Sequence, residues 1–183
     1  RRVAKGAGSD PGAVALGFGE RVMIAAVREG LASADAGVQR LAIGAAAVAK
    51  AKTAARELRA IADGAMDVEL RGAAIEALAA IGDVDAAPLL VTILERDAGA
   101  NLELTASAAH ALAALDAKAE VARVVGAWLA AGKAGATPAD RAKTWAALIA
   151  ASGAPVPSAI ADIGKLAATG EPRVRGAVCR ALG

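Results

Sequence analysis

DVELRGAAIEALAAIGD, residues 67–83, is the stretch that decides the fold. Its larger apolar side chains recur at near-helical spacing, at Leu70, Ile75, Leu78 and Ile81. Asp67 stands where a helix N-cap is expected, and Gly82 with Asp83 supplies a turn. The stretch therefore predicts a helix over residues 67–81 that ends in a tight turn.

The same pattern returns along the chain at a nearly fixed interval. LRGAAIEAL begins at Leu70, LTASAAHAL at Leu104, DRAKTWAAL at Asp140 and VRGAVCRAL at Val174, so the copies are 34, 36 and 34 residues apart. A weaker copy begins at Val38. This is the period of a two-helix repeat. The periodicity and the breaker residues predict ten helices, roughly at residues 14–31, 36–50, 52–63, 67–81, 86–97, 102–115, 118–131, 138–151, 156–168 and 172–182.

The composition favours an all-α fold. Ala fills 56 of the 183 positions and aromatic residues make up 2%. Because Ala is the best helix former and a poor strand residue, a large β-sheet is close to excluded. One Cys and one His exclude a disulfide framework, a multi-Cys zinc site and a pair of catalytic His.

Residues 68–83, with their echo at residues 172–183, resemble the HEAT-like repeat family, in particular the short bacterial type also found in phycobilisome lyase-like proteins. The shared signature is an acidic residue, Val or Leu followed by Arg, Ala-x-x-Ala-Leu, and Gly. The resemblance implies a right-handed α-solenoid of about five helical hairpins, with residues 1–183 as a single array. Two departures are Ala in place of larger aliphatics, as at Ala109, and a last repeat that ends at Gly183 before its second helix. Because an uncapped solenoid end exposes apolar surface, we expect the array to continue in a longer chain or to be capped by a partner.

The charge is unevenly distributed. Residues 1–62 carry ten Lys and Arg against five Asp and Glu, residues 63–103 two against nine, and residues 104–183 nine against five. An acidic middle between basic ends indicates contacts at particular patches. It argues against a long nucleic-acid track, and the few aromatics argue against stacking on single strands.

One cluster of cations is a candidate binding surface. Lys52, Arg56 and Arg59 lie at i, i+4 and i+7, on one helical face. Within that helix no acidic residue lies three or four positions from Lys52 or Arg59 except Asp63, four residues from Arg59. The face is either an ordinary solvated surface or a docking strip for an acidic partner. Its acidic counterpart is Asp83, Asp85, Glu95, Asp97 and Glu103.

Other residues admit both a structural and a functional interpretation. Arg71, Arg141 and Arg175 share one repeat position, and the family resemblance implies that they brace adjacent repeats, although a ladder that binds an acidic ligand is the alternative. Trp128, near a helix end, is either packing or a binding residue. The repeat positions predict an inward ladder of Ile75, Ala109, Trp145 and Cys179, with Cys179 buried, and they place His110 outward with Glu76.

These observations favour a non-enzymatic scaffold that binds a protein or peptide on its concave face. No phosphate-binding loop, Ser-His-Asp set or paired catalytic Glu is present in the sequence, so we expect no cofactor and no metal. Two alternatives stay open: an accessory domain of a lyase-like or modification-linked enzyme, and nucleic-acid binding through the basic ends. The longest uncharged run is broken by Gly and Pro, which argues against a transmembrane segment, and a single Cys favours the cytoplasm.

Overall fold

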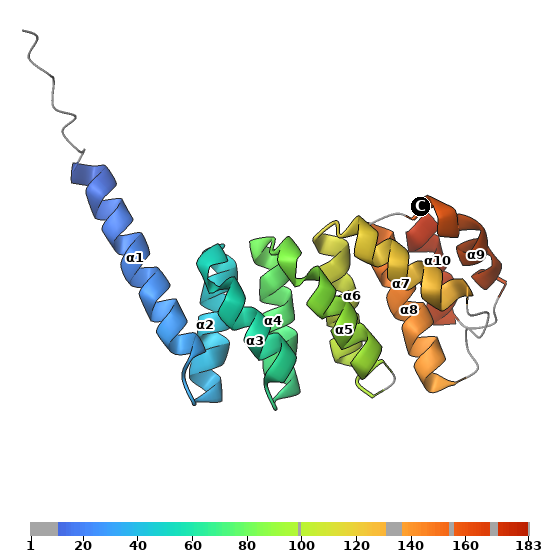
Figure 1. The fold of residues 1–183 in the computed structure, drawn as a ribbon, viewed down its shortest axis with the longest axis horizontal. Coiled ribbons are helices and arrows are strands. Elements are labelled where there is room, and N and C mark those ends of the chain that lie inside the picture. The colour runs from blue at the N-terminus through green and yellow to red at the C-terminus, as the bar shows by residue number, and fades with distance from the viewer. Residues whose placement is uncertain (1–10, 99, 131–136, 154–155, 169–171, 183) are drawn as a thin grey trace, which may run out of the picture.

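The computed structural model describes residues 11–98, 100–130, 137–153, 156–168 and 172–182, which form helices and turns without a strand (Figure 1). The helices are α1 (Pro11–Leu31), α2 (Ala36–Val48), α3 (Ala55–Gly64), α4 (Val68–Ile81), α5 (Ala87–Asp97), α6 (Leu102–Ala114), α7 (Lys118–Ala130), α8 (Pro138–Gly153), α9 (Ile160–Leu166) and α10 (Pro172–Leu182). Single 3-10 turns precede three of them: η1 (Lys52–Ala54), η2 (Val84–Ala86) and η3 (Pro157–Ala159). The predicted all-α fold and its ten helices are confirmed in these residues.

The helices form two layers. Within each layer the helices follow one another along the long axis of the molecule in chain order (Figure 1). The even layer comprises α2, α4, α6, α8 and α10, and each of these helices packs closely against the next one in the layer. The odd layer comprises α1, α3, α5, α7 and α9, which touch one another only sparsely and lie against the even helices.

The packed pairs are α1/α2, α3/α4, α5/α6, α7/α8 and α9/α10. The copies that are visible in the sequence begin with the even helices, and the last copy was therefore expected to lack its second helix. In the structure the odd helix that packs on α4 is α3, which precedes it, and the odd helix that packs on α10 is α9. In a periodic sequence the boundary between repeats is arbitrary, and only the packing shows which neighbours form a unit.

Small residues allow the even helices to approach closely. Ala74, Ala108 and Ala146 are fully buried in successive even helices. A Cβ added to Gly153 of α8 would lie 2.5 Å from the Cβ of Ala113 in α6. Since each Ala removes little area from water, the apolar driving force depends on the Leu and Ile side chains between the layers, at about 1.5–3 kcal/mol for each one buried.

Every even helix from α2 to α8 begins with a capping side chain at the same repeat position. Asp35, Asp67 and Asn101 accept the N–H groups of Val38 at 2.9 Å, Glu69 at 2.8 Å and Leu104 at 2.9 Å. The Thr137 hydroxyl accepts the N–H of Asp140 at 3.1 Å. The N-cap predicted at Asp67 is confirmed, and caps of this kind satisfy N–H groups that a helix cannot pair internally.

The ends of three even helices also share one conformation. Lys50, Gly82 and Asp116 have φ of 53°, 71° and 50°, the left-handed region. The N–H of the residue after each of them donates to a carbonyl five residues earlier, as from Asp83 to Leu78 at 3.0 Å. This bond closes the last turn and reverses the chain. Of these three positions only Gly82 was predicted as a turn, because a Lys or an Asp does not by itself mark a left-handed position.

Burial follows repeat position, with one correction. Ile43, Ile75 and Ala109 are buried, and Trp145 is half-buried, as the ladder predicts. Cys179, at the same position in α10, is exposed, so its predicted burial is wrong. The reason is that no described helix follows α10 in the even layer, and the face that Cys179 occupies is therefore uncovered.

Candidate protein-binding surface

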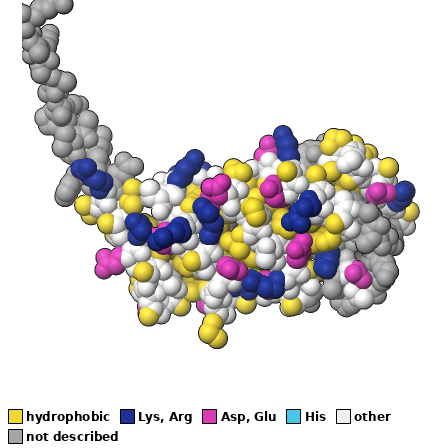
Figure 2. All heavy atoms as spheres, viewed as in Figure 1, with side chains coloured by type: hydrophobic (Ala, Val, Ile, Leu, Met, Phe, Trp, Pro, Cys, Tyr) yellow, Lys and Arg dark blue, Asp and Glu magenta, His cyan; other side chains and the backbone are white. Residues whose placement is uncertain are grey.

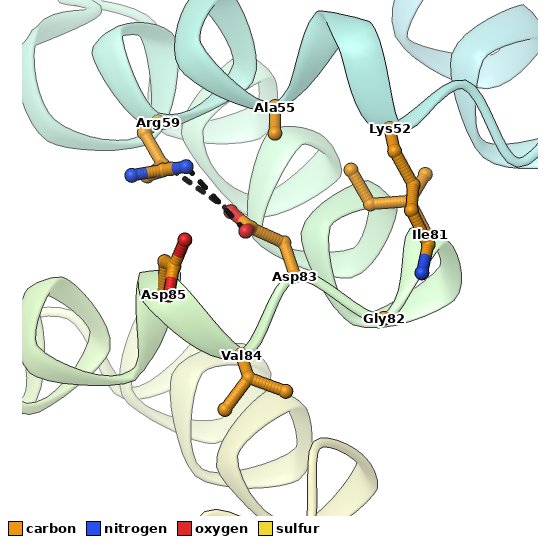
Figure 3. Close-up of a pocket in the computed structure, with 8 residues that line it drawn as sticks. All are labelled: Lys52, Ala55, Arg59, Ile81, Gly82, Asp83, Val84 and Asp85. Atoms are coloured by element: carbon orange, nitrogen blue, oxygen red, sulfur yellow. Dashed lines mark hydrogen bonds and ion pairs between the residues drawn. The ribbon is translucent and has the colours of Figure 1, made fainter.

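A pocket of about 380 Å³ lies between α3 and the turn that joins α4 to α5 (Figure 3). Its walls come from η1 and α3 on one side and from the α4 C-terminus and η2 on the other. The pocket is lined by Lys52, Ala55, Arg59, Ile81, Gly82, Asp83, Val84 and Asp85. The structure therefore brings two predicted basic residues together with two predicted acidic ones.

The left-handed turn at Gly82 brings the acidic residues to this wall. It ends α4 and directs the chain into η2, so Asp83 and Asp85 face α3 from the next repeat (Figure 3). Arg59 Nε lies 2.9 Å from Asp83 Oδ2, and Arg59 Nη2 lies 3.5 Å from Oδ1. The geometry at Nε and Oδ2 is too bent for a hydrogen bond, so the two atoms form a close ion pair. Arg59 is thus not part of an uncompensated basic strip, because its counter-charge comes from the neighbouring repeat.

The other charged residues around the pocket, Lys52, Arg56 and Asp85, are exposed to solvent. Lys52 is exposed and has no ion pair among the described residues, and its ammonium group points away from the Arg59–Asp83 pair (Figure 3). The Arg56 side chain is 87% exposed and lies 4.0 Å from Glu57 at its closest. Asp85, on the opposite wall, is exposed and turns towards Arg59 (Figure 3). Two cations of the predicted strip are therefore available to a partner, and the third is occupied.

Other charges on the odd layer join its helices to one another. Arg28 of α1 binds Glu57 of α3 at 2.7 Å, Arg96 of α5 lies 3.0 Å from Asp63 of α3, and Arg123 of α7 lies 3.7 Å from Glu95 of α5. Figure 2 shows the result on the side that it views, where Lys and Arg are interspersed with Asp and Glu. The electrostatic potentials of neighbouring cations and anions cancel at a distance. The described residues on this face therefore present no continuous basic track of the kind that a nucleic acid requires.

Glu57 lies near two cations, Arg28 of α1 and Arg56 of its own helix. It lines a second cleft of about 480 Å³, on the side of α3 that faces the α1–α2 turn. Burial alone would raise its pKa, but the hydrogen bond from Arg28 and the charges of Arg28 and Arg56 outweigh this, and the pKa lies below its usual value. Its Oε1 accepts both Arg28 nitrogens, at 2.9 and 2.7 Å, whereas the buried Oε2 has no hydrogen-bond partner.

Arg71 forms hydrogen bonds with two odd helices. Its Nε donates to the carbonyl of Ala62 at 3.0 Å, and its Nη2 donates to Asp97 at 2.8 Å, with the side chain 11% exposed. Asp97 also accepts from Arg96 at 3.2 Å. Arg71 thus makes the contacts to α3 and α5 that the bracing interpretation requires, and the bracing role itself stays a prediction.

The related positions differ from Arg71. Arg141 and Arg175 are exposed, so their bracing role stays a prediction. Thr105 occupies the same repeat position in α6, where its hydroxyl donates to the carbonyl of Asn101 at 2.6 Å. Asp97 and Glu57 were not predicted as partners of these arginines, although acidic residues near the ends of the odd helices were the available signal.

Trp128 is half-buried against the core, and Lys143 Nζ lies 5.9 Å from its ring centroid. This geometry allows a cation–π contact between α7 and α8, which supports packing. His110 is exposed, as its repeat position predicts. Neither residue joins the pocket beside α3.

The described residues lack the features of two other kinds of site. No group of three or more His, Cys, Asp or Glu lies close enough together to hold a metal ion in those residues, so Asp83 and Asp85 form no such group. Within the same part of the chain, no helix combines the length and the apolar character needed to cross a membrane.

Comparison with known proteins agrees with the architecture. The family model for HEAT repeats matches residues 24–113, which run from α1 to α6 and include the pocket beside α3. Proteins of this family are generally protein–protein interaction scaffolds and typically have no catalytic activity. No curated protein sequence matches the chain significantly.

Proposed function

Because residues 24–113 of this chain belong to the HEAT-repeat family, we propose that the chain is a non-catalytic protein-binding module that takes an acidic segment of its partner along α3. Lys52 and Arg56 are the residues that make this contact, and the neighbouring pocket receives the side chains that flank it. The surface belongs to the odd layer, whose helices are sparsely packed against one another and leave clefts between them.

The single observation that supports this site most is the difference between Lys52 and Arg56 and three arginines on neighbouring parts of the odd layer. Arg28, Arg59 and Arg96 each have a close carboxylate partner within the chain. Lys52 has none in the described residues, and Arg56 reaches no carboxylate more closely than 4.0 Å. An acidic partner would form charge-assisted hydrogen bonds with both groups at little cost, since neither must leave an existing ion pair.

The pocket contributes apolar contact surface in addition to the charged groups. Ala55 and Ile81 give it an apolar wall, and Val84 of η2 is an exposed apolar residue beside its acidic side. Interfaces combine apolar anchors with a polar rim, and this pocket offers both within one repeat boundary. Asp85 at the opposite wall favours a segment that places a basic or neutral residue there, so the pocket also sets the direction of the bound segment.

Affinity capture from the native source tests the proposal. The wild-type chain and the double variant Lys52→Glu/Arg56→Glu are used as bait under the same salt conditions. The matched control is Lys118→Glu/Arg123→Glu, which makes the same change in net charge at exposed positions of α7. We expect the wild type and the control to retain the same partner and the α3 variant to lose it.

The captured protein, once purified, is then titrated at two salt concentrations. Binding by the wild type should weaken as salt rises, because the proposed contact is between exposed charges. The α3 variant should bind weakly and with little salt dependence. Equal affinity of the wild type and the α3 variant would show that α3 is an ordinary solvated face.

A further inference from the structure

Three exposed residues form a row that joins the pocket beside α3 to the second cleft. Lys52, Arg56 and Ala60 follow one another at intervals of four residues, and η1 runs directly into α3 between the first two. Lys52 lines the pocket, and Ala60 lines the cleft of about 480 Å³ on the other side of α3. Because residues four apart in a helix lie on neighbouring turns of one face, a segment that contacts Lys52 and Arg56 continues towards the cleft.

Arg56 lies at the edge of that cleft. Its Nη2 is 4.0 Å from Oε1 of Glu57, a residue of the cleft wall. The same oxygen accepts a hydrogen bond from Arg28 at 2.7 Å. Two arginines thus share one carboxylate, and this edge of the cleft keeps an excess of positive charge. An acidic residue of a partner is attracted to this edge.

The walls of the cleft are largely apolar. Leu31, Ile61 and Leu70 supply buried parts of them, and Met66, which also lines the cleft, is fully exposed. A Met side chain adapts to the shape of a bound group, and an apolar group in the cleft would remove it from water. Asp67 lines the cleft as well and would repel an acidic group there. The cleft therefore favours a large apolar side chain.

We propose that the bound segment of the partner is extended and carries two acidic residues and one large apolar residue at alternate positions. The acidic residues contact Lys52 and Arg56, and the apolar residue enters the cleft beside Ala60. This inference rests on the proposed function and specifies the partner more closely, as a segment of the pattern acidic-x-acidic-x-apolar or its reverse.

The spacing of the row supports this pattern. Four residues of an α-helix rise about 6 Å along its axis. Two residues of an extended chain span about 6.6 Å, and alternate side chains of such a chain point to the same side. Every second side chain of an extended segment can therefore meet successive members of the row, while the intervening side chains point away from α3.

Fluorescence anisotropy of the 183-residue chain with synthetic peptides tests the pattern. Each labelled peptide has Gly-Ser flanks and one of four cores: Glu-Ser-Glu-Ser-Leu, its reverse Leu-Ser-Glu-Ser-Glu, the Leu-free Glu-Ser-Glu-Ser-Ser, and the respaced Glu-Glu-Ser-Ser-Leu. We expect one of the first two to bind about tenfold more tightly than the Leu-free and respaced peptides, because only that peptide buries its Leu while both Glu residues meet cations. A wild type that shows no such preference in either order would overturn the proposal.

Substitutions at the cleft separate the apolar contact from simple charge attraction. Ala60→Lys adds a cation to the row, so charge alone predicts tighter binding of every peptide. The proposal predicts that the preference for the Leu peptide over the Leu-free peptide disappears, because the charged side chain occupies the entrance to the cleft. Met66→Ser should reduce the same preference. The matched control is Val48→Ser, at an exposed apolar residue that lines neither the pocket nor the cleft, and it should bind like the wild type.

Circular dichroism melts establish that all variants are folded. A preference for the Leu peptide that survives Ala60→Lys unchanged would exclude the cleft as its binding place. Lys52→Glu/Arg56→Glu should lose all four peptides. If that double variant loses binding while the wild type does not distinguish the Leu peptide from the Leu-free one, the acidic contact stands and the apolar contact fails, so the two proposals fail separately.

Discussion

Arg59 of α3 and Asp83 of the turn after α4 form an ion pair across a repeat boundary, with Nε 2.9 Å from Oδ2. The Asp83 side chain is 10% exposed, so the carboxylate depends on this one cation for compensation. The pair connects the proposed binding surface to the stability of the array: Arg59 holds two repeats together, whereas Lys52 and Arg56 beside it are available for a partner.

Arg59→Ala should therefore destabilise the chain, and Arg56→Ala should not. Removing Arg59 leaves a nearly buried carboxylate without its partner, which costs about 1–3 kcal/mol in the free energy of unfolding. Arg56 is exposed, so its removal should change that free energy by less than about 0.5 kcal/mol. Urea unfolding followed by circular dichroism measures both, and equal effects would show that the Arg59–Asp83 pair contributes no stability.

Arg71→Ala should be the more damaging of the arginine substitutions. Arg71 donates to Ala62 and Asp97 from a side chain that is 11% exposed, so truncation removes the donor of the Ala62 carbonyl, leaves Asp97 with Arg96 alone, and costs about 3 kcal/mol. Arg71→Lys keeps the positive charge but lacks the planar guanidinium that reaches both acceptors. It should therefore recover only part of the free energy of unfolding that Arg71→Ala loses.

Arg40→Ala is the matched control for Arg71, because Arg40 pairs with Glu69 on the surface of the same layer at 2.6 Å. Exposed pairs contribute about 0–1 kcal/mol. A loss at Arg40 as large as that at Arg71 would contradict the bracing role.

The bracing residues also show how far the sequence could predict this protein. Repeat spacing and Ala content predict the helices, the N-cap at Asp67 and the place of Arg71, because these depend on local chemistry and on period. The partners of Arg59 and Arg71 come from the next repeat, 24 and 26 residues away, and helical spacing within one segment does not show them. The exposure of Cys179 was missed for a related reason, since repeat alignment assumes that every helix has a neighbour on both sides.

Asp116→Gly should stabilise the chain. Asp116 holds a φ of 50° at the end of α6, the position that Gly82 occupies at the end of α4. Gly adopts this conformation without strain, and the substitution should add about 0.5–1 kcal/mol to the free energy of unfolding. The ion pair lost with Lys118 is exposed and contributes little. Gly82→Ala, which removes a Gly from the equivalent position, should lower the melting temperature, whereas Asp116→Gly should raise it. A lower melting temperature for Asp116→Gly would contradict the account.

Stability at acid pH should depend on Glu57. Because Arg28 and Arg56 hold its pKa below the usual value in the folded chain, Glu57 contributes stability that is present above the unfolded pKa, about 4.3. That contribution is lost as the pH falls through the lower pKa of the folded state. Glu57→Gln should reduce stability at neutral pH and show a smaller further loss between neutral and acid pH. Urea unfolding at several pH values measures the difference, and parallel pH profiles for the two chains would exclude the linkage.

Hydrogen exchange measured by mass spectrometry, with and without the captured partner, tests the proposed binding surface most directly because it needs no substitution. The account predicts that bound partner slows amide exchange in α3 and in the turn at residues 82–86, and leaves exchange in α7 unchanged. Slower exchange confined to other helices, with α3 and that turn unaffected, would contradict the claim that this array binds its partner along α3.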